Sequence, residues 1–189
     1  MSAPFTTRRF TVEEYHRMAE AGVLHEDDRV ELLDGQIVVM SPIGTRHAAA
    51  VGRLTRLFSE RTGDRAIVWV QNPIVIGRYW EPQPDLCLLR PRADFYAAAH
   101  PRPEDVLLAV EVADATAEED RQRKLPEYAR AGIPEAWLVD LAHDTIEDHR
   151  DPGAEGYGAV KVLRRGDTLV LLVVPTAPIA ADEVLGPKA

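Results

Sequence analysis

The sequence predicts a mixed α/β fold in which a central sheet has one helix before its middle strands and another after them. Short apolar runs bounded by turn residues recur along the chain, and such runs are typical of buried strands. Two longer segments, 45–61 and 118–131, are instead expected to be helical. The chain has 189 residues, the length of one domain, which we expect over residues 1–189 with its core at about 8–186.

The chain is expected to begin with a helix and a hairpin. Thr11 and Glu14 have the spacing of a capping box, and Gly22 would end the short helix that follows. The pair Asp34-Gly35 stands between two apolar runs, and this combination is the strongest short-range signal for a β-hairpin. The sequence therefore predicts a hairpin ahead of the central sheet.

Two helices are predicted on either side of the middle strands. Residues 45–61 carry apolar side chains at helical spacing, with the arginines largely off that stripe. Residues 118–131 form the second helix, which ends at Gly132. Pro126 must lie in the first turn of that helix or kink it, because a proline donates no backbone hydrogen bond.

The remaining apolar runs predict the strands. Before the second helix, strands are expected near 66–71, 74–79, 85–90 and 106–112. After it, a buried strand is expected at 135–139 and a more exposed one at 145–150. The tail is expected to form a hairpin between 160–163 and 168–174, so that hairpins are predicted at both ends of the chain.

Composition and charge limit the class of function. The net charge is −9, and residues 67–150 hold nine Lys/Arg against sixteen Asp/Glu, which excludes a protein that coats nucleic acid through a basic surface. No stretch approaches the about 20 apolar residues of a membrane span, and the N-terminus has no apolar core that would serve as an export signal. We therefore expect a soluble, cytoplasmic protein. No glycine-rich phosphate loop is present, so no nucleotide cofactor is expected.

Carboxylates inside predicted strands are the candidate chemistry. Asp85 opens one apolar run and Glu111 lies near the end of another. A buried carboxylate is costly unless a proton, a cation or a metal compensates it. Asp85 and Glu111 would give a hard cation such as Mg²⁺ two oxygen ligands, with the Val112 carbonyl as a third. Structural ion pairs also bury carboxylates, so a metal site and an ion pair both remain open on this pattern.

Three further charged residues have two interpretations each. Lys124 would hold an attacking water or neutralise a phosphate beside such a metal. Asp120 and Lys124 are four residues apart on a predicted helix, where an ordinary surface ion pair is the alternative. Glu31 either completes an acidic rim or is an exposed strand residue. His100, His143 and His149 show no ligand spacing, and without paired cysteines no structural zinc site is expected.

The order of several motifs resembles the Uma family of restriction-endonuclease-like proteins, from about Phe10 to Leu185. The most specific motif is the closing stretch Ala131-Gly132-Ile133-Pro134-Glu135-Ala136-Trp137-Leu138-Val139-Asp140. The motifs before it are Glu31-Leu32-Leu33-Asp34-Gly35, Ser41-Pro42 with His47, Pro84-Asp85, Val110-Glu111-Val112 and Asp120-x-x-x-Lys124-x-x-x-Tyr128.

The resemblance implies a restriction-endonuclease-like, PD-(D/E)xK fold and an endonuclease that hydrolyses DNA phosphodiester bonds by water attack. It implies Mg²⁺ as the cofactor, for which Mn²⁺ can substitute, and a homodimer, because double-strand cleavage needs two sites. Asp85 and Glu111 match the two metal carboxylates, and Glu31 matches the acid upstream. Lys124 matches a lysine that this family carries on the following helix, because Ala113 stands where the general pattern has it.

Four residues are candidates for substrate binding: Arg46, His47, Asp120 and Tyr128. His47 matches a family position and would touch a substrate phosphate, with a solvated histidine at a helix start as the alternative. Tyr128 falls one turn after Lys124, where it would either reach the site or pack in the core.

The chain also departs from the family pattern. The loop after Glu111, usually of the type Ser-Pro-Ser-Thr, reads Asp114-Ala115-Thr116 and is one residue shorter. Asp114 would either tighten metal binding or disturb the site by repulsion. The alternative function is therefore a catalytically degenerate member of the same fold that serves as a nucleic-acid or protein interaction module. Convergence of Lys124 and Glu111 would favour the nuclease. A glycosidase is disfavoured, because nothing supplies aromatic platforms for a sugar.

Overall fold

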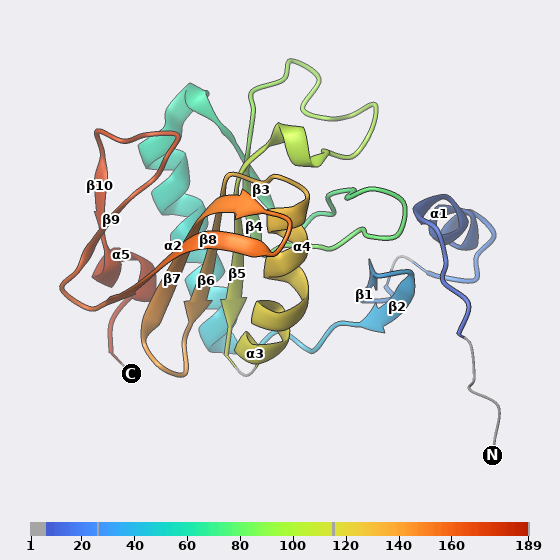
Figure 1. The fold of residues 1–189 in the computed structure, drawn as a ribbon, viewed down its shortest axis with the longest axis horizontal. Helices are drawn as coiled ribbons and strands as arrows, with labels where there is room; N and C mark the ends of the chain where they lie inside the picture. The colour runs from blue at the N-terminus through green and yellow to red at the C-terminus, as the bar shows by residue number, and fades with distance from the viewer. Residues whose placement is uncertain (1–6, 26, 115, 189) are drawn as a thin grey trace.

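A six-stranded mixed sheet forms the centre of the computed structural model, which describes residues 7–25, 27–114 and 116–188 (Figure 1). The strand order is β3-β4-β5-β6-β7-β8, and every neighbouring pair is antiparallel except β5 and β6. The expected central mixed sheet is therefore confirmed. Its strands are β3 (Ile67–Val70), β4 (Leu86–Leu89), β5 (Val106–Ala113), β6 (Glu135–Asp140), β7 (Thr145–Gly153) and β8 (Gly156–Arg164).

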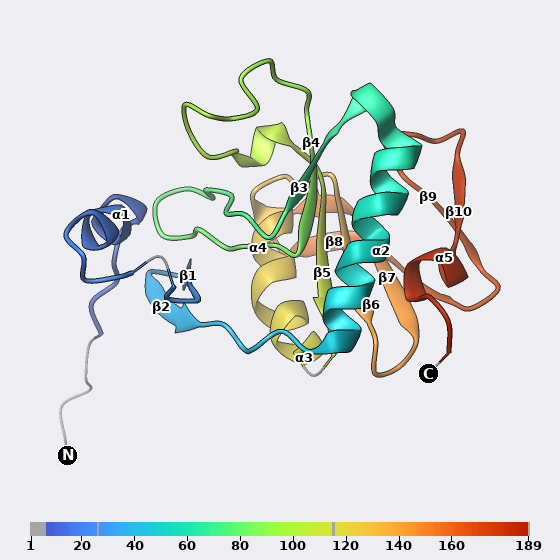
Figure 2. The same cartoon turned by 180° about the vertical axis from the view of Figure 1, so that it is seen from behind.

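Helices cover both faces of the sheet (Figures 1 and 2). Helix α2 (Thr45–Thr62) packs on one face, and α4 (Leu125–Arg130) packs on the other, preceded by α3 (Ala117–Glu119) and a π-helical turn η3 (Asp120–Lys124). Successive strand residues alternate between the faces. Val110 and Val112 of β5 therefore belong to the core under α2, and Ala109 and Ala113 to the core under α4.

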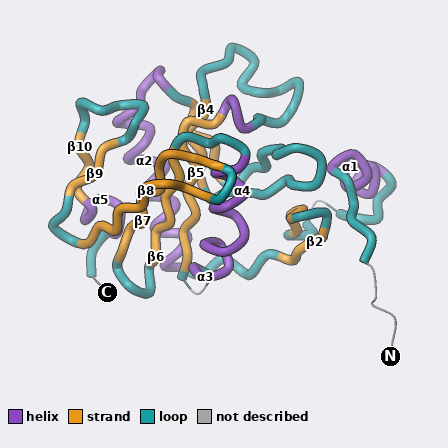
Figure 3. The backbone as a smooth tube through the Cα atoms, viewed as in Figure 1, coloured by secondary structure: helices purple, strands orange, loops and turns teal. Residues whose placement is uncertain are grey.

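Smaller elements lie at the two ends of the molecule (Figures 1 and 2). One end carries α1 (Val12–Glu20) and the hairpin of β1 (Val30–Leu33) and β2 (Gln36–Val39). The other carries β9 (Thr168–Val170), β10 (Pro178–Ala180) and α5 (Ala181–Leu185). Long loops, 71–85 and 90–105, join β3 to β4 and β4 to β5 (Figure 3), and short 3₁₀ turns are η1 (Gly63–Arg65) and η2 (Pro103–Asp105). No helix of the described residues is long and apolar enough to cross a membrane.

The local signals at the N-terminus are confirmed. Thr11 accepts a hydrogen bond from the Glu14 N–H, and the Glu14 side chain accepts one from the Thr11 N–H, which completes the capping box. Asp34 and Gly35 both have positive φ, 52° and 74°, as a tight hairpin turn requires. A Cβ at position 35 would lie 2.6 Å from the Cβ of Arg9, so glycine is needed there for space as well as for conformation.

Pro126 lies in the first turn of α4, directly after the π-helical turn. The N–H of Leu125 donates to the carbonyl of Asp120, five residues back, instead of the usual four. A proline at the second position of α4 has no N–H to donate, and the widened turn before it relieves the clash of its ring with the preceding carbonyls. Pro126 therefore lies in the first turn of α4, and the helix expected over 118–131 is interrupted by the π-helical turn before it.

Two strand predictions are wrong in detail. Residues 74–79 form a loop, because the chain turns at Gly77 (φ 61°) and only an isolated bridge joins Ile76 to Trp80. The strand expected to be more exposed, 145–150, is an interior strand between β6 and β8. Its buried polar side chains have partners, as in the 2.9 Å ion pair of Asp148 with Arg150.

The expected C-terminal hairpin between 160–163 and 168–174 is wrong. The run 160–163 belongs to β8 and pairs with β7, while β9 pairs with β10. The turn between β8 and β9 contacts α5 and does not fold back on the sheet. The Gly166 N–H donates to Asp182 at 2.8 Å, and Arg165 forms an ion pair with the same carboxylate at 3.3 Å. These contacts direct the chain away from the sheet edge.

The α2 face of the core depends on an aromatic pair. The rings of Phe58, on α2, and Trp137, on β6, meet edge to face with centroids 5.7 Å apart, and both side chains are fully buried. We expect Phe58→Ala to lower the free energy of unfolding by about 3–5 kcal/mol, because it removes buried area and leaves a cavity. Urea denaturation measures this difference. Phe95→Ala, at an exposed phenylalanine, is the matched control and should change stability by less than about 0.5 kcal/mol.

Candidate functional site

A cavity of about 330 Å³ opens at one end of strands β4 and β5. Its walls come from the β1–β2 hairpin, the segment that leads into α2, the end of the 71–85 loop and the helical segment from α3 to η3. All four residues predicted as catalytic line it, together with three that were predicted to bind metal or substrate: Glu31, Asp85, Glu111 and Lys124, with Val112, His47 and Asp120. The fold thus brings together residues that are spread over about half of the sequence.

Strand pairing places the two predicted metal carboxylates side by side. Leu86 is paired with Val110 in the antiparallel register of β4 and β5. Continuing that register by one residue puts Asp85 opposite Glu111, on the α4 side of the sheet. The same side holds Cys87 and Tyr128, which belong to the core under α4. The carboxylates therefore face the helical segment that carries the lysine.

Asp85 is held by three donors. The backbone N–H of Val112 donates to its Oδ2 at 2.9 Å, and the side-chain amide of Gln71 donates to its Oδ1 at 3.3 Å. His47, at the start of α2, brings its Nε2 to 3.0 Å from the same carboxylate. The hydrogen bond with Asp85 raises the pKa of His47 despite partial burial. The orientation of Asp85 is thus fixed by the neighbouring strand and by α2.

Lys124 lies among three carboxylates. Its Nζ is 3.1 Å from Glu31 Oε1 and 3.5 Å from Glu111 Oε2. It is also 3.9 Å from Asp120 Oδ1, one turn earlier on its own helix. Burial opposes the charge of the ammonium group, but the carboxylates around it raise the pKa of Lys124 well above its usual range. Lys124 is therefore a protonated, buried cation, and the surface ion pair considered from the sequence is wrong for it.

Glu111 is the most deeply buried of the acids facing Lys124. Only 3% of the residue is exposed, and the hydroxyl of Tyr128 donates to its Oε1 at 2.6 Å. Burial raises the pKa of Glu111 well above the usual range of a glutamate, while Lys124 acts in the opposite direction. Burial likewise raises the pKa of Asp120, which accepts a hydrogen bond from the Thr116 hydroxyl at 3.1 Å. Tyr128 is fully buried in the core and contacts the site through Glu111, without lining the cavity.

Charge is not balanced in the cavity. Six carboxylates line it (Glu31, Asp85, Glu111, Asp114, Glu119 and Asp120), whereas its basic groups among the described residues are Arg29, Arg123, Lys124 and the imidazole of His47. Buried, uncompensated carboxylates are costly, so an additional cation would be stabilised here. Oxygen donors of this kind suit a hard divalent ion such as Mg²⁺.

The carboxylates do not form a closed cage. Within the described part of the chain, only His16, Glu81 and His100 bring three ligand atoms within 4.8 Å of one another, and this group lies outside the cavity. Mg²⁺ is commonly held by one or two carboxylates together with waters. The donor set of Asp85, Glu111 and the Val112 backbone fits that pattern.

Two residues predicted to bind substrate, Arg46 and Tyr128, do not line the cavity, and two arginines that were not predicted do. Arg46 does not line the cavity, because its guanidinium donates to Asp114 at 2.9 Å and to the Leu141 carbonyl at 2.6 Å. That ion pair also occupies Asp114, while Ala115 lies outside the described residues. Arg29 and Arg123 line the cavity instead, and neither follows a sequence pattern that would have pointed to it.

Gln83 was also missed. Its backbone N–H donates to Glu31 Oε2 at 3.0 Å and so fixes the carboxylate on the side away from Lys124. Its position between the two prolines that precede Asp85 is the only sequence signal, because the contact depends on how the 71–85 loop folds over the hairpin.

One protein family matches nearly the whole chain. The Uma2 family, described as "putative restriction endonuclease", matches residues 12–181. The chain belongs to the Uma2 family. The family expected from the order of the motifs is therefore confirmed, and the Uma2 match extends from α1 to the first residue of α5.

A solved structure supports the fold of this Uma2 chain. A crystal structure described as "a putative nuclease belonging to DUF820", from Anabaena variabilis, superposes with a TM-score of 0.75 and 15% sequence identity. The match covers 93% of this chain and 97% of that chain. At this identity the likeness concerns the fold, and the expected restriction-endonuclease-like class is confirmed. A search of curated proteins finds no match.

Proposed function

We propose that this Uma2-family protein is a Mg²⁺-dependent endonuclease that hydrolyses phosphodiester bonds in DNA. One observation carries the proposal: Lys124 and Glu111 meet at 3.5 Å in a cavity that also contains Asp85 and Glu31. This convergence is the feature that separates a nuclease from a degenerate interaction module, and it favours the nuclease. The family description and the fold of the similar structure support the same reaction class.

Asp85 and Glu111 would hold the Mg²⁺, with the Val112 carbonyl as a further oxygen ligand. Bound there, the ion supplies a water of lowered pKa and stabilises negative charge on the phosphoryl group. Tyr128 fixes one oxygen of Glu111 through its 2.6 Å hydrogen bond. The Val112 N–H, Gln71 and His47 fix Asp85 in the same way.

Lys124 would act as a cation and not as a base. The surrounding carboxylates keep it protonated, so it can orient the attacking water by donating a hydrogen bond and can neutralise the developing negative charge. Glu31 positions the Lys124 ammonium at 3.1 Å. Arg29 and Arg123 at the cavity wall would attract the phosphates of the substrate, which the net acidic chain does not do by its overall field.

The proposed reaction also bears on the assembly. Cleavage of both DNA strands needs two active sites, so we propose that the protein acts as a homodimer. We further propose a cytoplasmic location, with which the free, buried Cys87 agrees.

A plasmid assay with a metal titration tests the proposal. We expect the native protein to nick supercoiled DNA with Mg²⁺ or Mn²⁺ and not with EDTA. We also expect either ion to raise the Tm of the native protein but not that of Asp85→Ala, because a ligand that binds only the folded state stabilises it. Asp64→Ala, at an exposed aspartate outside the cavity, is the control and should keep the metal-dependent rise. Equal rises in the native protein and Asp85→Ala would contradict the ligand assignment, and intact plasmid in both ions would contradict the nuclease.

A further inference from the structure

We propose that His16, Glu81 and His100 form a second metal site, which takes Zn²⁺ or a similar late first-row divalent ion and fastens helix α1 to the two long loops. The site is separate from the acidic cavity, since none of these three residues lines it. It would have a structural role and does not depend on the proposed nuclease activity.

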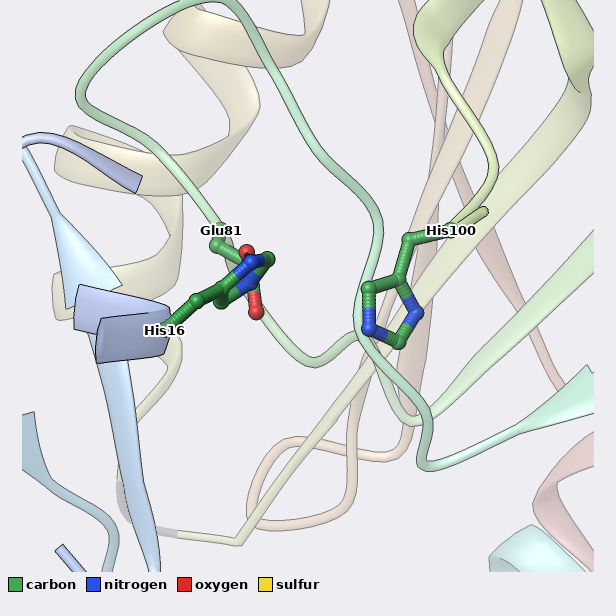
Figure 4. Close-up of side chains that lie close together, drawn as sticks. All are labelled: His16, Glu81 and His100. Atoms are coloured by element: carbon green, nitrogen blue, oxygen red, sulfur yellow. Dashed lines mark hydrogen bonds and ion pairs between the residues drawn. The ribbon is translucent and has the colours of Figure 1, made fainter. Parts of the chain in front are cut away.

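Three segments far apart in the sequence meet at this site (Figure 4). His16 lies on α1, Glu81 in the 71–85 loop and His100 in the 90–105 loop. One ligand atom from each lies within 4.8 Å of the other two. The Nε2 atom of His16 is 2.6 Å from Glu81 Oε2, and the rings of His16 and His100 have centroids 5.9 Å apart.

The charge of Glu81 calls for a cation. Only 4% of the residue is exposed, yet among the described residues its carboxylate has neither a lysine nor an arginine within ion-pairing distance. The single hydrogen-bonding partner found for it there is the His16 ring. A buried carboxylate without full compensation is costly, and a divalent ion between the carboxylate and two imidazoles would remove that cost.

The donor set indicates which ion would bind. Two imidazole nitrogens and one carboxylate oxygen are ligands of Zn²⁺, whereas Mg²⁺ and Ca²⁺ prefer oxygen alone. A tetrahedral Zn²⁺ with bonds of about 2.0–2.1 Å needs ligand atoms about 3.3 Å apart. The His16–Glu81 contact of 2.6 Å would therefore open by less than about 1 Å, which rotation of the two side chains allows. Both histidines are partly accessible, so water can take the fourth position.

A metal ion at this site would stabilise the docking of the N-terminal helix α1. Helix α1 buries none of its nine residues fully, so hydrophobic packing alone holds it weakly. An ion on His16 would tie α1 to the 71–85 loop at Glu81 and to the 90–105 loop at His100. Metal binding of this kind contributes directly to folding stability.

The proposed ion would also restrain two residues of the acidic cavity. The backbone of Glu81 is paired with Leu32, with N–H to oxygen distances of 2.8 and 3.3 Å, directly beside Glu31. Two residues further along, Gln83 donates to the Glu31 carboxylate, and the segment ends at Asp85. Fixing Glu81 would thus limit the motion of a segment that positions Glu31 and Asp85.

Zinc binding to tag-free protein, stripped with a chelator and dialysed, tests the proposal. We expect one tightly bound Zn²⁺ per chain by metal analysis after gel filtration, a rise in Tm, and Co²⁺ absorption typical of a tetrahedral site. His100→Ala removes an exposed ligand with little risk to folding. Loss of a hydrogen bond to a metal ligand weakens metal binding by about 10–100-fold. Loss of the ligand itself should weaken Zn²⁺ binding by more than that.

Two control variants distinguish this site from zinc bound elsewhere on the protein. His143→Ala, at an exposed histidine on another part of the surface, should bind Zn²⁺ like the native protein. Asp85→Ala should also keep the zinc, which distinguishes this site from the one proposed for Mg²⁺. Absence of stoichiometric Zn²⁺ in the native protein would overturn the inference, as would equal binding by His100→Ala. Loss of Zn²⁺ in Asp85→Ala with retention in His100→Ala would assign the zinc to the acidic cavity and overturn it too.

Discussion

Replacing Glu111 by glutamine should reduce Mg²⁺-dependent cleavage of plasmid DNA by at least about 10³-fold. The substitution keeps the size of the side chain and an oxygen that can accept the 2.6 Å hydrogen bond from Tyr128. It removes the negative charge that a hard cation needs. It also removes one of the three carboxylates around Lys124. The ammonium group still has Glu31 at 3.1 Å and Asp120 at 3.9 Å to compensate its charge, so the protein should remain folded. Initial rates of plasmid nicking by the variant and the native protein give the ratio, after circular dichroism has shown that both are folded.

Glu135→Gln is the matched control for that experiment. Glu135 is another buried strand glutamate, 1% exposed, on β6 next to β5. It faces the α2 side of the sheet, like Trp137, whose indole N–H donates to it at 3.0 Å. Its loss should lower stability and leave cleavage per folded molecule unchanged. Equal losses of cleavage in both variants would mean that any buried glutamate of the sheet affects cleavage through folding alone. Glu111 would then lose its proposed role as a metal ligand.

Replacing Lys124 by methionine should have two large effects at once. Without the ammonium group, Glu31, Glu111 and Asp120 face one another in a buried site, and breaking a buried ion pair from one side costs about 3–5 kcal/mol. Cleavage should fall by at least about 10²-fold, because the water and the phosphate lose their protonated donor. Chemical denaturation in EDTA measures the first effect, and plasmid nicking measures the second.

Metal should partly rescue the stability of that variant. A divalent ion bound to Asp85 and Glu111 takes over some of the compensation that Lys124 provided, so Mn²⁺ should raise the Tm of Lys124→Met more than that of the native protein. Lys161→Met, at an exposed lysine on β8, is the control and should behave like the native protein in both measurements. A Lys124→Met protein that cleaves at the native rate would remove the lysine from the mechanism.

The parts of the fold that the sequence predicts well are governed by neighbouring residues. The capping box of Thr11 and Glu14 and the turn at Asp34-Gly35 form because their interactions span only a few positions. The pairing of β8 could not be predicted in the same way, since its partner is chosen by the packing of the whole sheet. In the run 74–79, Ile74 and Ile76 belong to a loop and still bury their side chains in the core. The apolar pattern there therefore reports burial and not a strand.

The site was predictable where burial and charge conflict. Asp85 and Glu111 stand in apolar runs, and a charge in such a run is conspicuous in the sequence alone. Lys124 was a candidate from the sequence as well, but an ordinary surface ion pair stayed open for it, because its direction depends on a π-helical turn that no spacing rule reveals. Arg46 does not line the cavity, and this could not be predicted, since its ion pair with Asp114 joins two segments 68 residues apart. The same holds for the His16–Glu81 pair, which was invisible to a search for ligand spacing because 65 residues separate its members.

The π-helical turn before Pro126 makes the distance along the chain between Glu111 and Lys124 a poor guide to activity. A π-turn accommodates one more residue than an α-turn, and each residue of an α-helix corresponds to a rotation of about 100°. A loop that is one residue shorter can therefore be followed by a helix that is one residue longer, and the ammonium group still arrives among the carboxylates. Relatives with unequal motif intervals should be judged by helix geometry instead of by counting positions.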